Sequence, residues 1–185
     1  MDFVHDSTFD GRKLKFFAVI DAFTRENLAL EVDTSIGGER VSRILDGIIA
    51  TRGHPGVIVS DNGPEFICKL MDAWPYKRGV KLQFIEPGKP MQNGFIESFN
   101  GKFRDECLNV SYFPGVRDAK AIATEFRHDY NNVRPHSSLK YMTPAEFAAA
   151  VANDFSPPRG AKGGGEGLGY GQTESRMVDS HLEWS

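Results

Sequence analysis

The sequence predicts an α/β protein with a mixed five-stranded sheet, in which three antiparallel strands precede two further strands and helices flank the sheet. Two observations support this fold class. Short apolar runs of strand length, separated by turn residues, fill the first part of the chain. Over residues 41–85, apolar residues at helical spacing then alternate with short apolar runs. The chain has 185 residues, enough for one well-buried core.

The three opening strands are marked by the turns between them. Apolar runs at 3–4, 14–21 and 28–32 are separated by an Asp10-Gly11 pair and by the polar segment 24–27. Asp-Gly pairs favour tight hairpins, and short connections join antiparallel neighbours. We therefore expect three sequential antiparallel strands.

A change in the spacing of apolar residues, from strand-like runs to helical spacing, indicates the elements that follow. Apolar residues at 41, 44, 45, 48 and 49 share one face of a helix that Gly53 and Pro55 end. Beyond it, the sequence predicts a buried strand at 57–59, a helix over 65–77, a strand at 82–85, a loop at 86–94, a helix from Phe95, a helix over 116–131, and a helix from Pro144 with Thr143 as its N-cap.

The composition changes near residue 150. Residues 1–150 carry the periodic pattern of a packed domain, whereas 151–185 are rich in glycine and proline and have almost no apolar periodicity. Such a segment buries too little apolar surface to offset the entropy of ordering it. We expect a core domain over 1–150 and a disordered or weakly ordered tail over 151–185.

Net charge and cysteine content exclude several classes of protein. A net charge of −3 and a pI near 6.0 argue against a freestanding, strongly basic nucleic-acid binder. An enzyme that handles nucleic acid through carboxylate-bound metal ions stays compatible with this charge. The two cysteines, Cys68 and Cys107, form no Cys-x-x-Cys pattern, so we expect neither a disulfide framework nor a structural zinc site, and a reducing cytosol fits. Neither a membrane span nor a secretory signal is expected.

Asp61 is the first candidate for chemistry. It ends the buried strand at 57–59, and functional sites in α/β sheets gather at the carboxyl ends of strands. The alternative is that Asp61-Asn62-Gly63-Pro64 simply forms a good turn.

Glu97 is the second candidate. On the helix from Phe95, the phenylalanines at 95, 99 and 103 form the expected buried stripe, and Glu97 lies about 200° around the helix from Phe95. Its face carries amides, an arginine and a glycine that would let another backbone approach closely. This content favours a functional surface over an ordinary solvated one; the residues are Asn93, Asn100, Gly101 and Arg104.

Carboxylates on the first two strands complete the candidate set. Asp2 and Asp6 share one face of the first strand, and Asp21 ends the second. The residues alone do not choose among these three. Two or three carboxylates can hold a pair of divalent metal ions about 3.5–4 Å apart, an arrangement that catalyses in-line phosphoryl transfer.

Six segments together resemble the D-D-35-E transposases of bacterial insertion sequences, of the OrfB type, and more distantly the retroviral integrase core. Thirty-five residues separate Asp61 from Glu97, the spacing that names the class. The resemblance covers about residues 1–150, and its motifs lie at 2–4, 19–25, 60–66, 92–101, 130–137 and 143–147.

The resemblance implies a ribonuclease-H-like fold and a DNA transposase core. By it, Asp2, Asp61 and Glu97 are the catalytic, metal-binding carboxylates, and Asp21 is structural. It also implies Mg²⁺ or Mn²⁺, cleavage of transposon ends and joining of the freed 3′-hydroxyl to DNA. Self-association on DNA and a bacterial cytoplasmic, nucleoid-associated location are expected. The helix-turn-helix region that relatives carry upstream is absent from this sequence.

DNA contacts are expected mainly through phosphates. For each cation the alternative is an ordinary solvated charge, and for His136 a structural hydrogen bond is favoured over catalysis. The candidates are Lys89, Asn93, Asn100, Lys102, Arg104 and Arg134.

Two other functions are compatible with the sequence. One is a non-catalytic remnant of the same fold that binds DNA or self-associates, for which the ordering of Asp2 is the discriminating feature. The other is a nuclease acting on RNA–DNA hybrids, which the 35-residue spacing disfavours.

Overall fold

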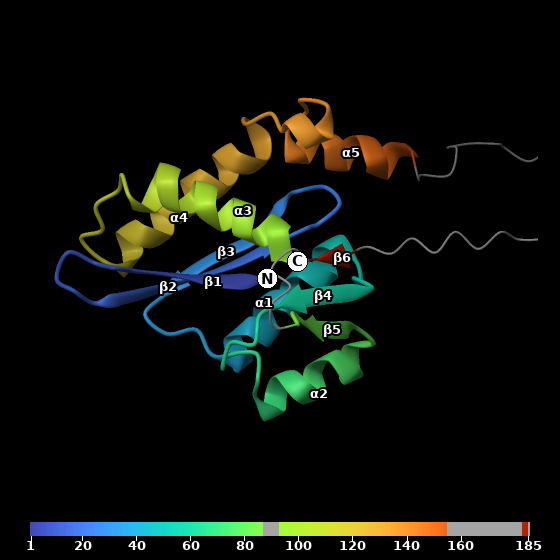
Figure 1. Cartoon of the computed structure of the whole chain (residues 1–185), viewed down its shortest axis with the longest axis horizontal. Helices are drawn as coiled ribbons and strands as arrows, with labels where there is room; N and C mark the ends of the chain where they lie inside the picture. Colours follow the sequence, from blue (N-terminus) through green and yellow to red (C-terminus); the bar gives the residue numbers. More distant parts are fainter. Residues whose placement is uncertain (87–92, 155–182, 185) are drawn as a thin grey trace, which may run out of the picture.

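A three-stranded antiparallel sheet forms the centre of the molecule (Figure 1). The computed structural model describes residues 1–86, 93–154 and 183–184. Strands β1 (Asp2–Ser7), β2 (Lys13–Ile20) and β3 (Asn27–Asp33) pair in the order β1-β2-β3, as the turn signals predicted.

A second, parallel sheet lies beside the start of β1. Its central strand β4 (Val57–Ser60) pairs with β5 (Lys81–Phe84) on one side and with the short β6 (Glu183–Trp184) on the other. The Met1 nitrogen donates a hydrogen bond to the Val59 carbonyl at 2.7 Å, so β1 begins next to the end of β4. The five predicted strands are present, but their ladders form two sheets, and β6 is an additional strand.

Helices cover both faces of the antiparallel sheet. Helices α1 (Gly38–Arg52) and α2 (Lys69–Arg78) belong to one side, and α3 (Gly94–Phe103) and α4 (Val116–Asn132) to the other (Figure 1). A π-helical turn (Arg104–Leu108) continues α3, a short 3-10 turn (Ser137–Leu139) follows α4, and α5 (Pro144–Asp154) ends this part of the chain.

Two helices differ from the sequence prediction in their bounds. Helix α2 begins at Lys69 rather than 65, because the amides of Phe66 and Ile67 both donate to the Gly63 carbonyl and form a turn first. Helix α5 continues to Asp154, beyond the expected boundary at 150. The expected disorder of the tail falls mainly on residues outside the described ranges.

Two apolar cores fill the space between sheet and helices. On one face, Phe16 meets Phe103 edge-on at 5.2 Å between ring centres, and α4 adds Phe126, 5.0 Å from Phe103. On the other face, Phe17 packs with α1 and with Phe66, which lies 6.2 Å away. The alternation of side chains along β2 sends neighbouring residues into opposite cores, which fixes α3 against β1 and β2.

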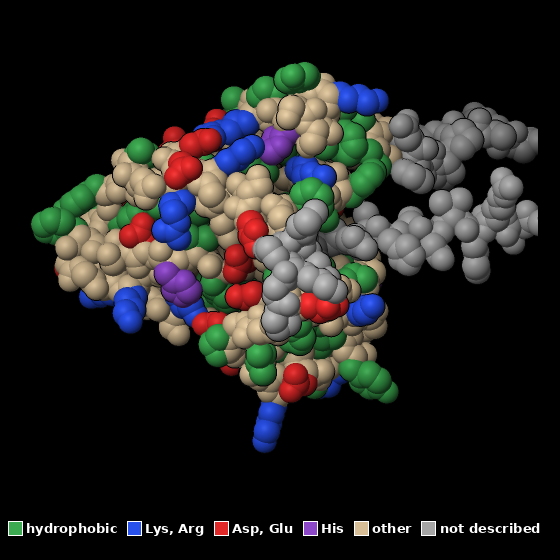
Figure 2. Space-filling model, viewed as in Figure 1, with side chains coloured by type: hydrophobic (Ala, Val, Ile, Leu, Met, Phe, Trp, Pro, Cys, Tyr) green, Lys and Arg blue, Asp and Glu red, His purple; other side chains and the backbone are tan. Residues whose placement is uncertain are grey.

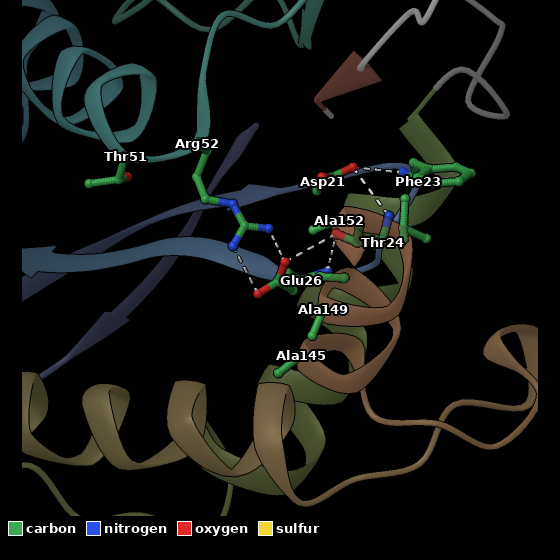
Figure 3. A pocket seen from close by; sticks show the side chains of 11 residues that line it. Asp21, Phe23, Thr24, Glu26, Thr51, Arg52, Ala145, Ala149 and Ala152 are labelled. Atoms are coloured by element: carbon green, nitrogen blue, oxygen red, sulfur yellow. Dashed lines mark hydrogen bonds and ion pairs between the residues drawn. The ribbon is translucent and has the colours of Figure 1, made fainter. Parts of the chain in front are cut away.

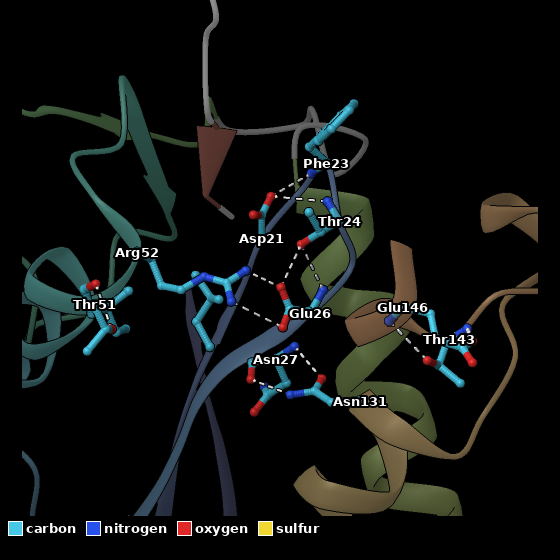
Figure 4. Close-up of polar contacts among 12 residues, drawn as sticks. Asp21, Phe23, Thr24, Glu26, Asn27, Thr51, Arg52, Asn131, Thr143 and Glu146 are labelled. Atoms are coloured by element: carbon cyan, nitrogen blue, oxygen red, sulfur yellow. Dashed lines mark hydrogen bonds and ion pairs between the residues drawn. The ribbon is translucent and has the colours of Figure 1, made fainter. Parts of the chain in front are cut away.

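Paired amides join α4 to the start of β3. The Asn27 amide donates to Asn131 Oδ1 at 2.8 Å, and Asn131 Nδ2 donates back to the Asn27 carbonyl at 3.0 Å (Figure 4). Arg127 adds bonds to the carbonyls of Asn27 and Leu28 at 2.9 and 2.7 Å. The motif at 130–137 therefore holds the β2–β3 hairpin against α4.

The N-cap predicted at Thr143 is confirmed. Thr143 Oγ1 accepts the Glu146 amide at 3.2 Å, and Glu146 Oε2 accepts the Thr143 amide at 2.9 Å (Figure 4). This reciprocal capping box satisfies donors at the start of α5. Among the described helices, none is both long and apolar enough to cross a membrane.

Candidate active site

Asp2 lies where β1, β4 and α3 meet. Its carboxylate is held on both oxygens: Oδ1 accepts the Phe3 amide at 2.7 Å, and Oδ2 accepts Asn100 Nδ2 at 2.7 Å. Asn100 is on α3, three residues after Glu97, so this bond brings the glutamate helix to the first strand. A carboxylate with two donors is fixed in orientation before any ligand arrives.

Asp61 follows the last residue of β4 and occupies a constrained loop. Its Oδ1 accepts the Gly63 amide at 3.1 Å, and the Asn62 side chain donates to the Ile85 carbonyl, 3.1 Å away beyond β5. A Cβ on Gly63 would lie 3.1 Å from Asp61 Oδ1 and 3.2 Å from Glu65 Oε2. Glycine is therefore the residue that leaves the Asp61 carboxylate room.

Glu97 is exposed on α3, away from the buried face, as its helical position predicted. The buried stripe itself differs from the prediction. Ile96, Phe99 and Phe103 are buried, whereas Phe95 is 48% exposed. Close approach of another backbone to Gly101 was also expected, but a Cβ there would meet no atom of the described residues within 4 Å.

Asp2 experiences the charge of both other carboxylates. Its pKa is raised, first by burial and then by repulsion from Asp61 and Glu97, although the Phe3 amide bond opposes the rise. Asp2 is thus within electrostatic range of both Asp61 and Glu97, and Figure 2 shows acidic side chains gathered near the middle of this face. Among residues 1–86, 93–154 and 183–184, no three His, Cys, Asp or Glu side chains are close enough to hold one metal ion.

The donor set suits a hard divalent cation. Carboxylate oxygens are the preferred protein ligands of Mg²⁺, which takes few of them and fills its shell with water and phosphate oxygens. Repulsion that raises the pKa of Asp2 would be relieved by a cation bound among the three carboxylates. The chemistry of these donors therefore fits Mg²⁺ or Mn²⁺, and binding would have to draw the three side chains closer together, because they do not form a ready three-ligand site among the described residues.

Asp21 has the geometry of a turn residue. It is 3% exposed, and its Oδ1 accepts the amides of Phe23 and Thr24 at 2.8 and 3.2 Å (Figure 4). It therefore shapes the β2–β3 turn, which agrees with the structural role that the family resemblance implied.

The amides predicted to contact DNA are directed inward. Asn93 is 3% exposed, and the Asn100 side-chain amide donates its hydrogen bond to the Asp2 carboxylate. Both have a buried Oδ1 with no hydrogen-bond partner within the described part of the chain. Asn100 is better explained as a residue that positions Asp2.

The predicted DNA-contacting cations differ in whether they form ion pairs within the described part of the chain. Arg134 forms ion pairs with Glu106 and Asp129, which compete with any contact to a DNA phosphate. Lys102 and Arg104 are exposed, and neither pairs with a carboxylate in the regions that the structure describes. Lys89 lies outside the described residues.

A separate hollow of about 500 Å³ is lined on one side by Asp21 and its neighbours in the β2–β3 turn. The Glu26–Arg52 ion pair forms one wall (Figure 3). Small side chains of α5 form the other wall, among them Ala145, Ala149 and Ala152. This hollow is lined by none of the three candidate carboxylates Asp2, Asp61 and Glu97, so we do not place the reaction there.

Comparison with known proteins agrees with this architecture. Two family models described as "Integrase core domain" match residues 1–90 and 78–144. The insertion element IS407 uncharacterized 31.7 kDa protein of Burkholderia multivorans is 48% identical over 149 residues, covering 80% of this chain and 54% of that protein. Transposase InsD for insertion element IS2 of Escherichia coli is 27% identical over 146 residues, covering 75% of this chain and 48% of that protein.

A solved structure shows the same fold at low sequence identity. The HTLV-2 integrase catalytic core domain in complex with magnesium, in its trimeric form, superposes with a TM-score of 0.57 at 18% identity, covering 79% of this chain and 91% of that chain. The fold is thus ribonuclease-H-like. The chain belongs to the integrase core domain family, in its insertion-sequence transposase branch. It spans about half the length of the two insertion-element relatives.

Proposed function

We propose that this chain is the catalytic core of a DNA transposase that performs metal-dependent phosphoryl transfer. The bond from Asn100, which brings the glutamate helix to Asp2, and the repulsion of Asp2 by Asp61 and Glu97 support this proposal. The reactions are cleavage at transposon ends and attack of the freed 3′-hydroxyl on a phosphodiester of the target. The core comprises the elements from β1 to the end of α5.

In this proposal the three carboxylates hold Mg²⁺ or Mn²⁺ and the chain orients them. Divalent ions at such sites activate the attacking hydroxyl and neutralise charge on the leaving oxygen. Asn100 fixes the direction of the Asp2 carboxylate, and the Gly63 amide fixes that of Asp61. No side chain is required as a general base.

The same core offers Lys102 and Arg104 to DNA phosphates, and Lys89 stays a prediction for the loop before α3. The HTLV-2 integrase core is described with magnesium and in dimeric and trimeric forms, which supports a divalent cation and self-association here. The cytoplasm, at the nucleoid, is the location that a transposase core of a bacterial insertion sequence implies.

The proposal is tested by strand transfer of an oligonucleotide carrying the transposon end, with Mg²⁺ or Mn²⁺ added. Replacing a partner of a metal ligand costs about 10–100-fold in activity, so loss of a ligand should cost at least that much. Asp2→Asn, Asp61→Asn and Glu97→Gln should therefore lose activity while circular dichroism shows the fold intact. Asp6→Asn is the matched control, because Asp6 lies on the same strand and accepts only the Ser7 amide in the described contacts.

Wild-type activity that persists in Asp61→Asn would reject the catalytic assignment. DNA binding without activity in any metal would instead support the non-catalytic remnant. Preferential cleavage of an RNA–DNA hybrid would support the hybrid nuclease.

A further inference from the structure

Two cationic side chains and a histidine, from distant parts of the chain, lie near α3. Arg25 is at the β2–β3 turn, Lys102 is on α3, and His136 follows α4. Burial lowers the pKa of His136, and the charges of Lys102 and then Arg25 lower it further. His136 is therefore within electrostatic range of both Lys102 and Arg25.

Arg25 is held in a fixed position with an unused donor. Its backbone is in the left-handed region, with φ of 62°, and its amide donates to the Asp21 carbonyl at 2.8 Å. Its guanidinium lies 3.5 Å above the centre of the half-exposed Phe95 ring, a cation–π contact. Nη1 is buried and has no hydrogen-bond partner among the residues described. An acceptor from outside the chain would satisfy it.

Among the described residues, Asp21 is the acidic group that acts on Arg25. Burial lowers the pKa of Arg25; Tyr130 and Asp21 oppose this, but Asp21 is buried and accepts two turn amides. Tyr130 meets the His136 ring edge-on at 5.1 Å, and burial raises its pKa to about 12, so it is neutral. Within the described ranges, none of the three side chains forms an ion pair.

Three small residues on the surface of α3 separate this cluster from Glu97. At about 100° per residue, Gly94, Ser98 and Gly101 project between the directions of Glu97 and Lys102. All three are exposed, and a Cβ on either glycine would meet no atom of the described residues within 4 Å. On the face in Figure 2, basic side chains and a histidine lie above the acidic group. These small residues leave room for a sugar–phosphate backbone to cross the helix.

We propose that Arg25, Lys102 and His136 form a phosphate-binding site for a DNA strand that crosses α3 on its way to the catalytic carboxylates. This inference rests on the proposed function and adds Arg25 and His136 to its DNA-binding surface. A guanidinium and an ammonium are the groups that contact backbone phosphates. His136 takes up a proton as a phosphate arrives, because an anion favours the charged imidazole over the repulsion from Lys102 and Arg25.

The test is DNA binding measured by fluorescence anisotropy between 50 and 200 mM salt, with Ca²⁺ in place of the catalytic metal. Each phosphate contact contributes about 0.9 to the slope of log affinity against log salt for duplex DNA. Arg25→Gln and Lys102→Gln should each lower that slope by about 0.9, which is about a three- to fourfold smaller loss of affinity across this range. Lys69→Gln is the control, because Lys69 is equally exposed but lies on α2.

The contribution of His136 is tested by pH. Wild-type binding should tighten from pH 8 to pH 6, and His136→Gln should flatten that dependence. The charged groups within range of His136 are Lys102 and Arg25, which stay cationic over this interval. An unchanged salt slope in both cation variants, or an unchanged pH dependence in His136→Gln, overturns the site.

Failure of this inference is separable from failure of the proposed function. Glu97→Gln should abolish strand transfer and leave the salt slope unaltered. If Glu97→Gln is inactive and the cation variants bind like wild type, the phosphate site is wrong and the transposase assignment stands. If Glu97→Gln is fully active, the transposase assignment falls. Tight binding of inorganic phosphate with no DNA dependence would show a free-anion site instead.

Discussion

Removal of the Asn100 side chain should uncouple Asp2 from the glutamate helix. In Asn100→Ala, the Asp2 carboxylate loses the donor to Oδ2, which lies 2.7 Å away, and keeps only the Phe3 amide. A hydrogen bond to a charged group contributes about 1.5–3 kcal/mol. Since 1.4 kcal/mol is about a tenfold change, metal affinity should fall about 10–100-fold, the range found for partners of metal ligands.

The pH dependence gives a second measurement of the same effect. Burial already raises the pKa of Asp2, and loss of a donor to the carboxylate raises it further, because the charged form loses a stabilising contact. Only the ionised carboxylate binds metal, so activity falls as pH drops through this pKa. The acidic limb of the activity profile should therefore lie at higher pH in Asn100→Ala than in the wild type.

The assay combines Mn²⁺ titration by calorimetry with strand transfer from pH 5 to pH 8. Asn132→Ala is the matched control, because Asn132 is exposed on α4 and its Nδ2 donates to the His128 carbonyl at 2.9 Å. Excess Mn²⁺ should restore much of the activity of Asn100→Ala, as expected for a residue that positions a ligand. Wild-type metal affinity together with an unshifted acidic limb would refute the positioning role.

Four further substitutions test other parts of the structure. Asp2→Asn should raise the thermal stability of the metal-free protein at neutral pH, because a buried charge with a raised pKa costs stability once pH exceeds that pKa; an unchanged melting temperature contradicts this. Phe103→Ala should cost about 3–5 kcal/mol in urea unfolding, because the ring is fully buried between Phe16 and Phe126; a loss below about 1 kcal/mol would show that the core is not packed as described. Arg104→Ala should lower the salt slope of DNA binding by about 0.9, whereas Arg134→Ala should lower stability and leave the slope unaltered, and the reverse pattern would exchange their roles.

Local spacing was sufficient to predict most of the fold. Turn residues bracket β1, β2 and β3, and the spacing of apolar residues predicts α1 and α4 within a few residues of their bounds. These signals act between neighbours in the chain, so they are readable without a tertiary structure. The start of α2 was misplaced. A turn closed on the Gly63 carbonyl takes the place of the predicted first helical turn.

The site was predicted in part. The family resemblance pointed to Asp2, Asp61 and Glu97, but their roles are still a proposal. The electrostatic coupling of the three and the bond from Asn100 to Asp2 required the structure, since 98 positions separate these two residues. Arg134 was predicted to contact DNA, yet the fold places it between two carboxylates.

The sequence by itself determined the order and type of the elements, the family motifs and the positions of the candidate carboxylates. Only the tertiary structure decided which polar groups face one another. It placed Arg25 over Phe95, brought His136 to Lys102 and directed Asn100 inward. The physical reason is that helical and strand periodicity fix the direction of a side chain relative to its own element, whereas its partner depends on how elements distant in sequence pack together.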